Sequence, residues 1–434
     1  MRRLKWLLST IVALATIGAA YQIIGMVLDR RHYPPPGQMV DIGGHRLHLY
    51  CLGTGTPTVI LEAAAPGWSL SWSNVQPQLA RTTRVCAYDR AGLGWSERGP
   101  LPRSGQRMAQ ELHRLLERAD IRGPYVLVGH SLGGLLTRLY QHDYPHDVVG
   151  MVLVDAGHES EMRQAEFRLF ASAGTSMLRV IRALTMLGVT RLMASADQLP
   201  QLLSQQEEKV SVAIRPMLRA GWLRTGYYST LTDENDGLID TLEQVRRSGS
   251  LGDLPLVVIT ATGPAWWPEM PGQVNPAKFR KMWLELQQNL TTLSTNSRQV
   301  FADQSSHFIP FDQPELVTTA VRQLVDRGHA QHRLEPAAHA AVVPPEVDTR
   351  RFHPPTPEEA AAARAAYGLP AGPLALFVGR LVERKGLDRL IAALPRVPEG
   401  TLAVAGYGDA TPYRAQAERA GVAARVRFLG AVDD

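Results

Sequence analysis

The chain has 434 residues, more than one ordinary domain needs, so we expect one large unit and something smaller. Hydrophobic residues make up 45% and charged residues 20%, which supplies a sizeable core and excludes a globally disordered chain. The net charge of +5 is scattered, without a basic block or interleaved aromatic residues, so we expect a solvated surface and no nucleic-acid partner.

The N-terminal segment is almost continuously apolar over residues 7–28 and has basic residues on both flanks. A stretch of this length can span a bilayer. A cleaved signal peptide is the alternative, with residues 18–20 as its small-residue cleavage site, yet the apolar character continues to Leu28. We therefore predict a single-pass anchor in the cell membrane over residues 1–32. The positive charges favour an inside N-terminus, with the following domain outside the cytoplasm.

Apolar, β-branched runs recur after a Pro-rich linker at residues 34–37 and predict eight strands. Their ranges are 38–42, 46–51, 58–62, 84–88, 125–129, 150–155, 256–260 and 298–302. Gly43-Gly44 between the first two indicates a hairpin. Helical patterns, such as residues 109–118 and 132–144, separate most of the later strands. This alternation predicts the α/β class, with a mainly parallel sheet covered on both faces.

Two further segments shape the expected domain organisation. Residues 158–253 are rich in Leu, Met and Arg at helical spacing and are too long for a crossover helix, so we expect a helical cap there. Residues 328–343 are rich in His and Ala and predict a linker. A new α/β pattern occupies residues 344–434, and we expect it to form a truncated, Rossmann-like second unit.

The segment Gly129-His130-Ser131-Leu132-Gly133 is the strongest indication of chemistry. A serine hydroxyl is a weak nucleophile until a base takes its proton, and acyl transfer also needs a carboxylate to orient the base and donors for the oxyanion. Small residues at both ends of Gly-x-Ser-x-Gly let a strand turn sharply into a helix and expose the serine. Here a predicted strand precedes the motif and a predicted helix follows it. We therefore predict Ser131 as a nucleophile and the backbone N–H of Leu132 as an oxyanion donor.

Residues 38–326 resemble an α/β-hydrolase of the esterase and lipase-like branch. Besides the serine motif, residues 88–96 are similar to the family's Asp-x-Arg-Gly-x-Gly-x-Ser turn, and residues 306–314 resemble the segment that carries its histidine. The resemblance implies His307 as the base and a hydrolase domain over residues 33–327 with the cap at about 158–253. His130 is expected to be structural, and His158 is a poorer candidate because it precedes the cap.

The carboxylate remains open between two residues. The family most often places its acid shortly after the strand that here is 256–260, and residues 261–268 contain no acid. Some members of the fold use an acid at the end of the preceding strand, where Asp155 stands. We favour Asp155 over the alternative acid Glu269, although Asp155 could instead only cap a turn. By position, the N–H of Ala64 is expected to join that of Leu132 in the oxyanion hole.

The resemblance implies acyl transfer to water through an acyl-serine, with a small-molecule ester as substrate and with no cofactor or metal. A serine in place of aspartate argues against haloalkane or epoxide hydrolysis, which need a carboxylate nucleophile. A membrane-tethered binding protein of the same fold is the second hypothesis. Cys51 and Cys86 lie on strands that are neighbours in this fold, so a disulfide and two buried thiols are both open.

Residues 344–434 resemble the donor-binding domain of glycosyltransferases that have two Rossmann-like domains and use sugar nucleotides. The matching segments are 347–352, 377–386, 404–408 and 426–430. In that family an arginine and a lysine approach the donor diphosphate, and Arg380 and Lys385 are the matching positions. The acceptor-binding half and a downstream Glu-x7-Glu segment are missing, so we expect a remnant with ordinary surface charges. Sugar-nucleotide transfer by this tail is the third hypothesis.

Overall fold

The structure is a computed structural model that describes most of the chain in two compact units, Met1–Pro336 and Ala337–Asp434. The described residues are 2–199, 201–264, 272, 274–334, 357–370, 372–378, 387–397, 399–405 and 408–430. The first unit contains every candidate for the serine chemistry, and the second contains the tail.

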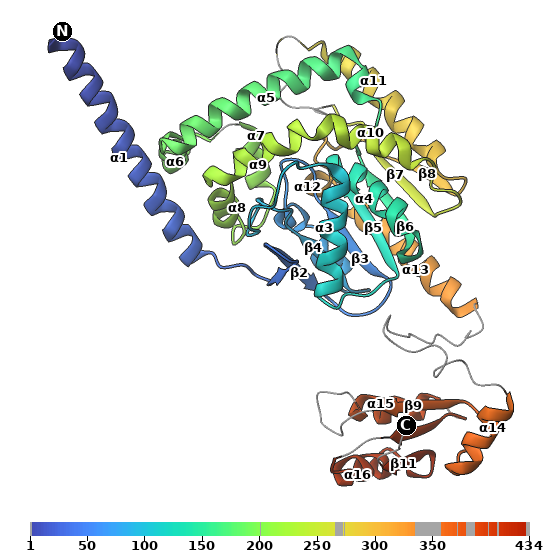
Figure 1. Cartoon of the computed structure of the whole chain (residues 1–434). Helices are drawn as coiled ribbons and strands as arrows, with labels where there is room; N and C mark the ends of the chain where they lie inside the picture. The colour runs from blue at the N-terminus through green and yellow to red at the C-terminus, as the bar shows by residue number, and fades with distance from the viewer. Residues whose placement is uncertain are drawn as a thin grey trace. The chain divides into compact units, whose positions relative to one another are not determined.

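An eight-stranded sheet lies at the centre of the first unit (Figure 1), as the sequence predicts. Its spatial order is β1-β2-β4-β3-β5-β6-β7-β8. β2 runs antiparallel to both of its neighbours, and the other pairs are parallel. The strands are β1 (Gln38–Asp41), β2 (Arg46–Leu52), β3 (Thr58–Glu62), β4 (Val85–Tyr88), β5 (Tyr125–His130), β6 (Val148–Val154), β7 (Leu256–Ala261) and β8 (Ser297–Ala302).

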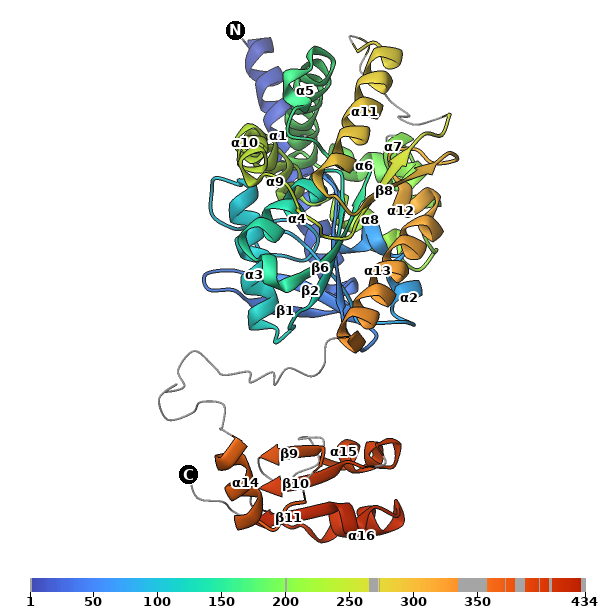
Figure 2. The ribbon, with the colours of Figure 1, turned by 90° about the vertical axis from the view of Figure 1, so that its right-hand side faces the viewer.

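Helices cover both faces of this sheet (Figure 2). One face packs on α3 (Gly105–Arg118), α4 (Leu132–Asp143) and α10 (Leu238–Ser248). The other packs on α2 (Gln76–Leu79), α11 (Pro276–Leu290) and α13 (Pro314–Leu334). In α3 the buried positions are 105, 108, 109, 111, 112, 115 and 116, the stripe that an amphipathic helix presents to a core. The strands β3, β4, β5 and β7 are buried at every position, because both faces are covered.

The cap lies between β6 and β7 and is helical. After η3 (Glu161–Arg163) it consists of α5 (Ala165–Met186), α6 (Val189–Ser195), α7 (Gln201–Glu208), α8 (Arg215–Trp222), α9 (Thr225–Asp236) and α10. Its buried side chains, such as Leu218, Trp222 and Tyr227, share one cluster with Trp68 and Phe308. These last two residues belong to loops beyond β3 and β8, so the cap is packed over the carboxyl ends of the strands. The short helices η1 (Ser69–Trp72) and α12 (Ile309–Asp312) lie in these loops.

Two features lie at the edges of this unit. Cys51 and Cys86 face each other in the β2–β4 register and form a disulfide, one of the two states that the sequence leaves open. The N-terminal helix α1 (Arg2–His32) is long and apolar enough to cross a membrane, by length and composition alone. Only 6% of the residues in its most apolar 18-residue stretch are buried in the protein.

The second unit contains a three-stranded parallel sheet in the order β11-β10-β9. The strands are β9 (Leu374–Val378), β10 (Thr401–Ala405) and β11 (Val426–Gly430), and the helices are α14 (Pro357–Ala366), α15 (Leu387–Ala393) and α16 (Thr411–Arg419). A separate small core joins side chains of these elements, such as Ile391, Val404 and Ala417. The predicted truncated Rossmann-like unit is thus present. Arg380 and Lys385, the predicted donor-phosphate positions, lie outside the described residues.

Candidate active site

Ser131 lies at a sharp turn between the end of β5 and the start of α4. Its backbone has φ 53° and ψ −118°, a combination that costs a non-glycine residue on the order of 1–3 kcal/mol. Three backbone hydrogen bonds hold it there: the Ser131 N–H donates to Val154 (3.1 Å), and the Ser131 carbonyl accepts from Gly134 and Gly157 (2.9 Å each). The turn is therefore fixed by the end of β6 and the chain after it.

The two glycines of the motif are required by close backbone contacts. A Cβ on Gly129 would lie 2.4 Å from the carbonyl oxygen of Gly133, and a Cβ on Gly133 would lie 2.4 Å from that of Glu62. Contacts this short exclude a side chain at either position. The first turn of α4, which carries Leu132, thus packs against the backbone that leaves β3 towards Ala64. Both predicted oxyanion donors belong to this small, buried region.

Asp155 and His307 are brought into direct contact by strands that are far apart in sequence. Asp155 follows β6 at φ 38° and is fully buried, and His307 lies in the loop between β8 and α12. The Asp155 Oδ2 is 2.6 Å from the Nδ1 of His307. The Asp155 Oδ1 accepts hydrogen bonds from the Ala261 N–H and the Trp283 Nε1–H, each at 3.0 Å. The carboxylate is therefore held in place and accepts the Nδ1–H of the imidazole, so Nε2 is the ring nitrogen that can act as a base.

The alternative acid, Glu269, lies outside the described residues, so only Asp155 can be placed relative to His307.

The residue before Ser131 ties the serine turn to the histidine loop. The Nε2 of His130 donates to the backbone carbonyl of His307 at 2.8 Å, and the two rings are 5.0 Å apart. Burial, together with the neighbouring His307, lowers the pKa of His130 to about 3. The ring is thus a neutral donor that links two loops, which agrees with the structural role expected from the sequence. His158 pairs instead with Asn289 at 2.9 Å.

Arg90 fixes the loop that carries Ala64, a role the sequence did not predict. Its guanidinium is buried and donates to the carbonyls of Ala63 (2.7 Å) and Ala64 (3.1 Å). It also donates to Glu62 at 2.9 Å and, through two nitrogens, to Glu234 of the cap helix α9 at 2.8 and 3.0 Å. The candidate oxyanion loop is therefore bonded both to the sheet and to the cap.

Trp283 is a second residue whose role the sequence did not indicate. Its position in an amphipathic helix is typical of an ordinary core tryptophan. Arg90 could have been selected from the sequence, since it belongs to the turn at residues 88–96 that resembles the family. Its hydrogen bond to Glu234 could not, because the two residues are 144 positions apart.

A cavity of about 530 Å³ opens beside the histidine loop. Ser306 and Phe308, the neighbours of His307, line it together with Phe311 and with Gln205 and Gln206 of the cap. Both apolar and polar groups face this space, and Ser131 and His307 are not among its lining residues. Within the part of the chain that the structure describes, no group of three or more His, Cys, Asp or Glu residues is arranged to hold a metal ion.

Comparisons with known families agree with both units. Residues 57–231 match the family model described as alpha/beta hydrolase fold, and residues 372–434 match the one described as Glycosyl transferases group 1.

Among curated proteins, an AB hydrolase superfamily protein of Gibberella zeae is 26% identical over 297 residues, which cover 62% of this chain and 86% of that protein. A probable transporter, efuK, of Hormonema carpetanum is 38% identical over 129 residues, which cover 28% of this chain. The match spans only 18% of the Hormonema protein's length.

Two solved structures of different activities are equally similar to the fold. A putative lipase from Acinetobacter baumannii has a TM-score of 0.52 at 16% identity, covering 72% of this chain and 97% of the lipase. A laboratory-evolved variant of potato epoxide hydrolase also has a TM-score of 0.52, at 18% identity, covering 67% of this chain and 98% of the hydrolase. The backbone alone therefore does not separate these chemistries, and the side chains of the site must do so.

Proposed function

The first unit of the chain belongs to the α/β-hydrolase superfamily, and from this premise we propose that it is a serine hydrolase that cleaves carboxylic esters. Ser131 is the nucleophile, His307 the base and Asp155 the acid that orients the base. The single observation that carries this proposal is the 2.6 Å contact between Asp155 and His307. The loop that contains His307 is in turn hydrogen-bonded to His130, the residue before Ser131.

The proposed reaction proceeds in two halves. In the first, the Nε2 of His307 takes the proton of the Ser131 hydroxyl while its oxygen attacks the ester carbonyl. The backbone N–H groups of Leu132 and Ala64 stabilise the oxyanion, and the protonated His307 gives its proton to the departing alcohol. In the second half, His307 takes a proton from a water that attacks the acyl carbonyl, and it returns that proton to the Ser131 oxygen as the acid leaves. The Asp155 carboxylate stabilises the imidazolium in both halves.

The nucleophile argues for ester cleavage over epoxide opening. Epoxide and haloalkane hydrolysis on this fold pass through an ester formed on a carboxylate. At the turn after β5 this chain has the serine hydroxyl of Ser131 instead. An acyl transfer step uses that hydroxyl directly.

Labelling with a serine-directed fluorophosphonate tests the proposal. We expect the full-length chain to be labelled and to hydrolyse p-nitrophenyl esters. Ser131→Ala should abolish labelling and reduce turnover by several orders of magnitude, on the order of 10⁶, the loss seen when a whole catalytic unit is disabled. Ser250→Ala, a change at an exposed serine between α10 and β7, is the matched control and should retain labelling. A chain that is inert to the probe would instead favour a binding protein of the same fold.

We also propose that α1 anchors the chain in the cell membrane and that the hydrolase unit lies outside the cytoplasm. The length and apolar composition of α1 support the anchor. The disulfide between Cys51 and Cys86 supports the placement, because disulfides persist in oxidising compartments. Sugar-nucleotide transfer by the tail has no comparable support from the described residues.

A further inference from the structure

The N-terminal helix is docked on the cap through one stripe of its surface. Gly18, Gln22, Gly25 and Asp29 recur at intervals of four, three and four residues, and they therefore share one face of α1. A Cβ on Gly18 would lie 2.1 Å from the carbonyl oxygen of Leu187, and one on Gly25 would lie 2.4 Å from the Arg191 side chain. The two glycines let α1 approach the corner between α5 and α6 closely, as in packed membrane helices.

The polar groups of this stripe are satisfied by the cap. Gln22 is 1% exposed, and its Nε2 donates to the carbonyl of Leu223 at 2.5 Å. The Arg191 guanidinium donates to the Gln22 Oε1 at 3.1 Å and to the Asp29 carboxylate at 2.7 Å. The cap arginine thus bridges two residues of α1, and the contact is specific as well as close.

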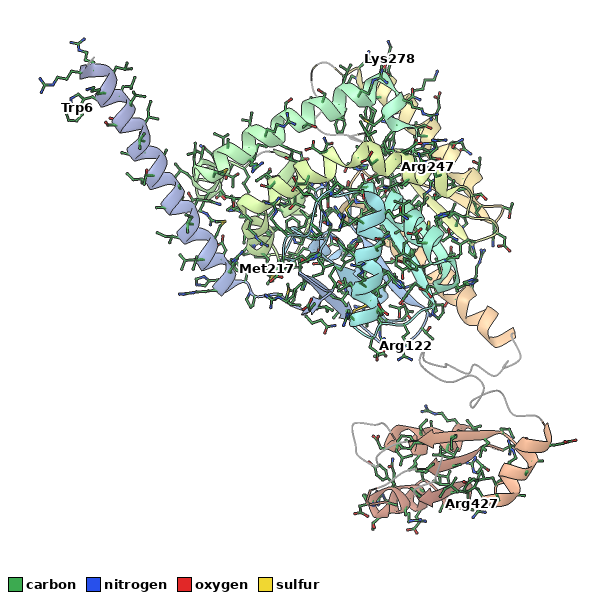
Figure 3. The ribbon with its side chains drawn as sticks, in the orientation of Figure 1. Trp6, Arg122, Met217, Arg247, Lys278 and Arg427 are labelled. Atoms are coloured by element: carbon green, nitrogen blue, oxygen red, sulfur yellow. A yellow bond between two sulfur atoms is a disulfide. The ribbon has the colours of Figure 1, made fainter. Side chains whose placement is uncertain are left out.

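This contact lies within the apolar span of α1. The apolar stretch at residues 7–28 contains Gly18, Gln22 and Gly25, and at 1.5 Å per residue the ten residues from 18 to 27 cover roughly 15 Å of helix. If α1 crosses a bilayer, the corner between α5 and α6 lies beside its hydrocarbon-spanning part. Figure 1 shows α6, at this corner, next to α1, Figure 2 shows α5 beside α1, and Figure 3 shows Trp6 at the projecting N-terminal end of the helix.

The surface of the corner has the composition of a lipid-facing segment. From Ala183 to Ala196 the sequence contains a single charged residue, Arg191, which is buried and paired with Asp29. The exposed side chains of this segment include four large apolar ones: Met186 (53%), Leu187 (43%), Leu192 (62%) and Met193 (36%). Clustered exposed apolar residues of this kind mark interaction sites in soluble proteins.

Basic residues flank the apolar corner on one side. Arg179 and Arg182 are exposed on the preceding turns of α5. Arginines near the end of an apolar segment are suited to the lipid headgroup region, where their charge stays hydrated or meets phosphate. The basic turns of α5 therefore directly precede the apolar corner, and α1 contacts this same corner.

We propose that the corner formed by residues 183–196 is immersed in the lipid bilayer beside α1, so that the cap is seated in the membrane. The proposal rests on the anchoring role proposed for α1 and is independent of the ester chemistry. The occupant of this apolar surface is the lipid itself. The buried bridge from Arg191 to Gln22 and Asp29 then keeps the single charge of the segment away from the acyl chains.

Site-specific fluorescence tests this placement, because both cysteines of the chain are in the disulfide and an introduced cysteine is the only free thiol. Leu187→Cys and Leu192→Cys are each labelled with the fluorophore NBD in the full-length chain. The protein is reconstituted in phosphatidylcholine vesicles with and without doxyl-labelled phosphatidylcholine, which quenches fluorophores in the bilayer. Val12→Cys in α1 is the positive control. Leu101→Cys and Ile239→Cys, which are as exposed as Leu192 but lie elsewhere, are the matched negative controls.

We expect NBD at 187 and 192 to be quenched as strongly as at 12, and several-fold more strongly than at 101 and 239. Quenching at 12 without quenching at 187 and 192 would overturn the immersion of the corner and leave the anchor intact. An absence of quenching at all five positions would overturn the anchor and the immersion together. Two corner positions are used so that the result does not depend on one variant folding.

Discussion

The carboxylate of Asp155 accepts three hydrogen bonds, and only one of them comes from His307. The other two donors, the Ala261 N–H and the Trp283 Nε1–H, both point at Oδ1. These two hydrogen bonds fix the orientation of the carboxylate and leave its Oδ2 for the imidazole of His307. This arrangement needs an acceptor at the Oδ2 position, because the amide nitrogen of an asparagine there would present a donor to Nδ1.

We therefore expect Asp155→Asn to keep the fold and to stabilise the wrong tautomer of His307. The loss in kcat should be on the order of 10⁴, the size seen when the acid of another serine hydrolase triad is changed in this way. Ester turnover and the rate of phosphonate labelling measure it, and Glu269→Gln is the matched comparison. If Glu269→Gln were the damaging change and Asp155→Asn the harmless one, the assignment of the acid would be wrong.

Glu161 provides a prediction about pH and stability. Burial raises the pKa of this carboxyl to about 8, and its Oε2 accepts a hydrogen bond from the His158 N–H at 3.2 Å. Between its usual value of 4.5 and about 8, the folded protein holds a proton that the unfolded chain has released. Stability therefore falls as pH rises through this window, by up to about 1.4 kcal/mol for each pKa unit.

Replacing Glu161 with Gln removes this proton and its pH dependence. We expect Glu161→Gln to match the parent protein in thermal unfolding near pH 4.5 and to unfold at a higher temperature near pH 8. Thermal unfolding followed by circular dichroism across this range is the measurement. Parallel melting curves for the two proteins at all pH values would show that the carboxyl is not protonated in the folded state.

At the scale of elements, Arg90 connects the sheet, the loop with Ala64 and the cap. Its guanidinium donates to five acceptor atoms. A lysine cannot replace these bonds, because its ammonium is a compact group with only three donors and a different reach. We expect Arg90→Lys to slow phosphonate labelling through a looser oxyanion loop. It should also destabilise the fold by roughly 3–5 kcal/mol, because it leaves buried carboxylates without a full partner.

A surface ion pair offers a control for this change. Arg98 and Asp233 also join the body of the unit to the cap helix α9, but the Arg98 side chain is 56% exposed. Arg98→Lys should change the free energy of unfolding by less than about 1 kcal/mol and leave labelling unaffected. Equal effects at positions 90 and 98 would contradict the role given to Arg90.

The elements of the sheet were predictable because each strand is a short β-branched run between turn residues. The predicted 58–62 is β3, and the predicted 298–302 differs from β8 by one residue. The cap was predictable as helical, since its apolar residues recur at helical spacing, but its division into six helices was not. The residues at which the cap helices begin and end depend on tertiary packing, for example of Trp222 at the end of α8 against Trp68.

The candidate site was predictable only where a local pattern carries it. Ser131 and His307 each stand in a recognisable segment. The choice between Asp155 and Glu269 remained open, because it depends on whether the residue after β6 or a residue after β7 reaches His307 in the folded protein. The donor Trp283 was not predictable, since its indole reaches Asp155 over 128 positions of sequence.

At the scale of the whole molecule, three features support the environment proposed for the first unit. α1 is apolar over a membrane-spanning length, the α5–α6 corner exposes apolar side chains beside it, and β2 is joined to β4 by a disulfide. The disulfide is the feature that depends on compartment, because a reducing cytosol would keep Cys51 and Cys86 as thiols. Its state in cells therefore tests the placement of the entire unit.

In the chain isolated from cells under alkylating conditions, we expect both cysteines to resist maleimide-polyethylene glycol until a reductant is added to the unfolded protein. The double change Cys51→Ser and Cys86→Ser should lower the free energy of unfolding in urea by roughly 2–5 kcal/mol, since the bond closes a loop across a sequence separation of 35 residues. Adding reductant should destabilise the parent protein and leave the double variant unchanged, because only the parent has a bond to lose. Free thiols in the freshly isolated chain would contradict an extracytoplasmic hydrolase unit, even if α1 were shown to span the membrane.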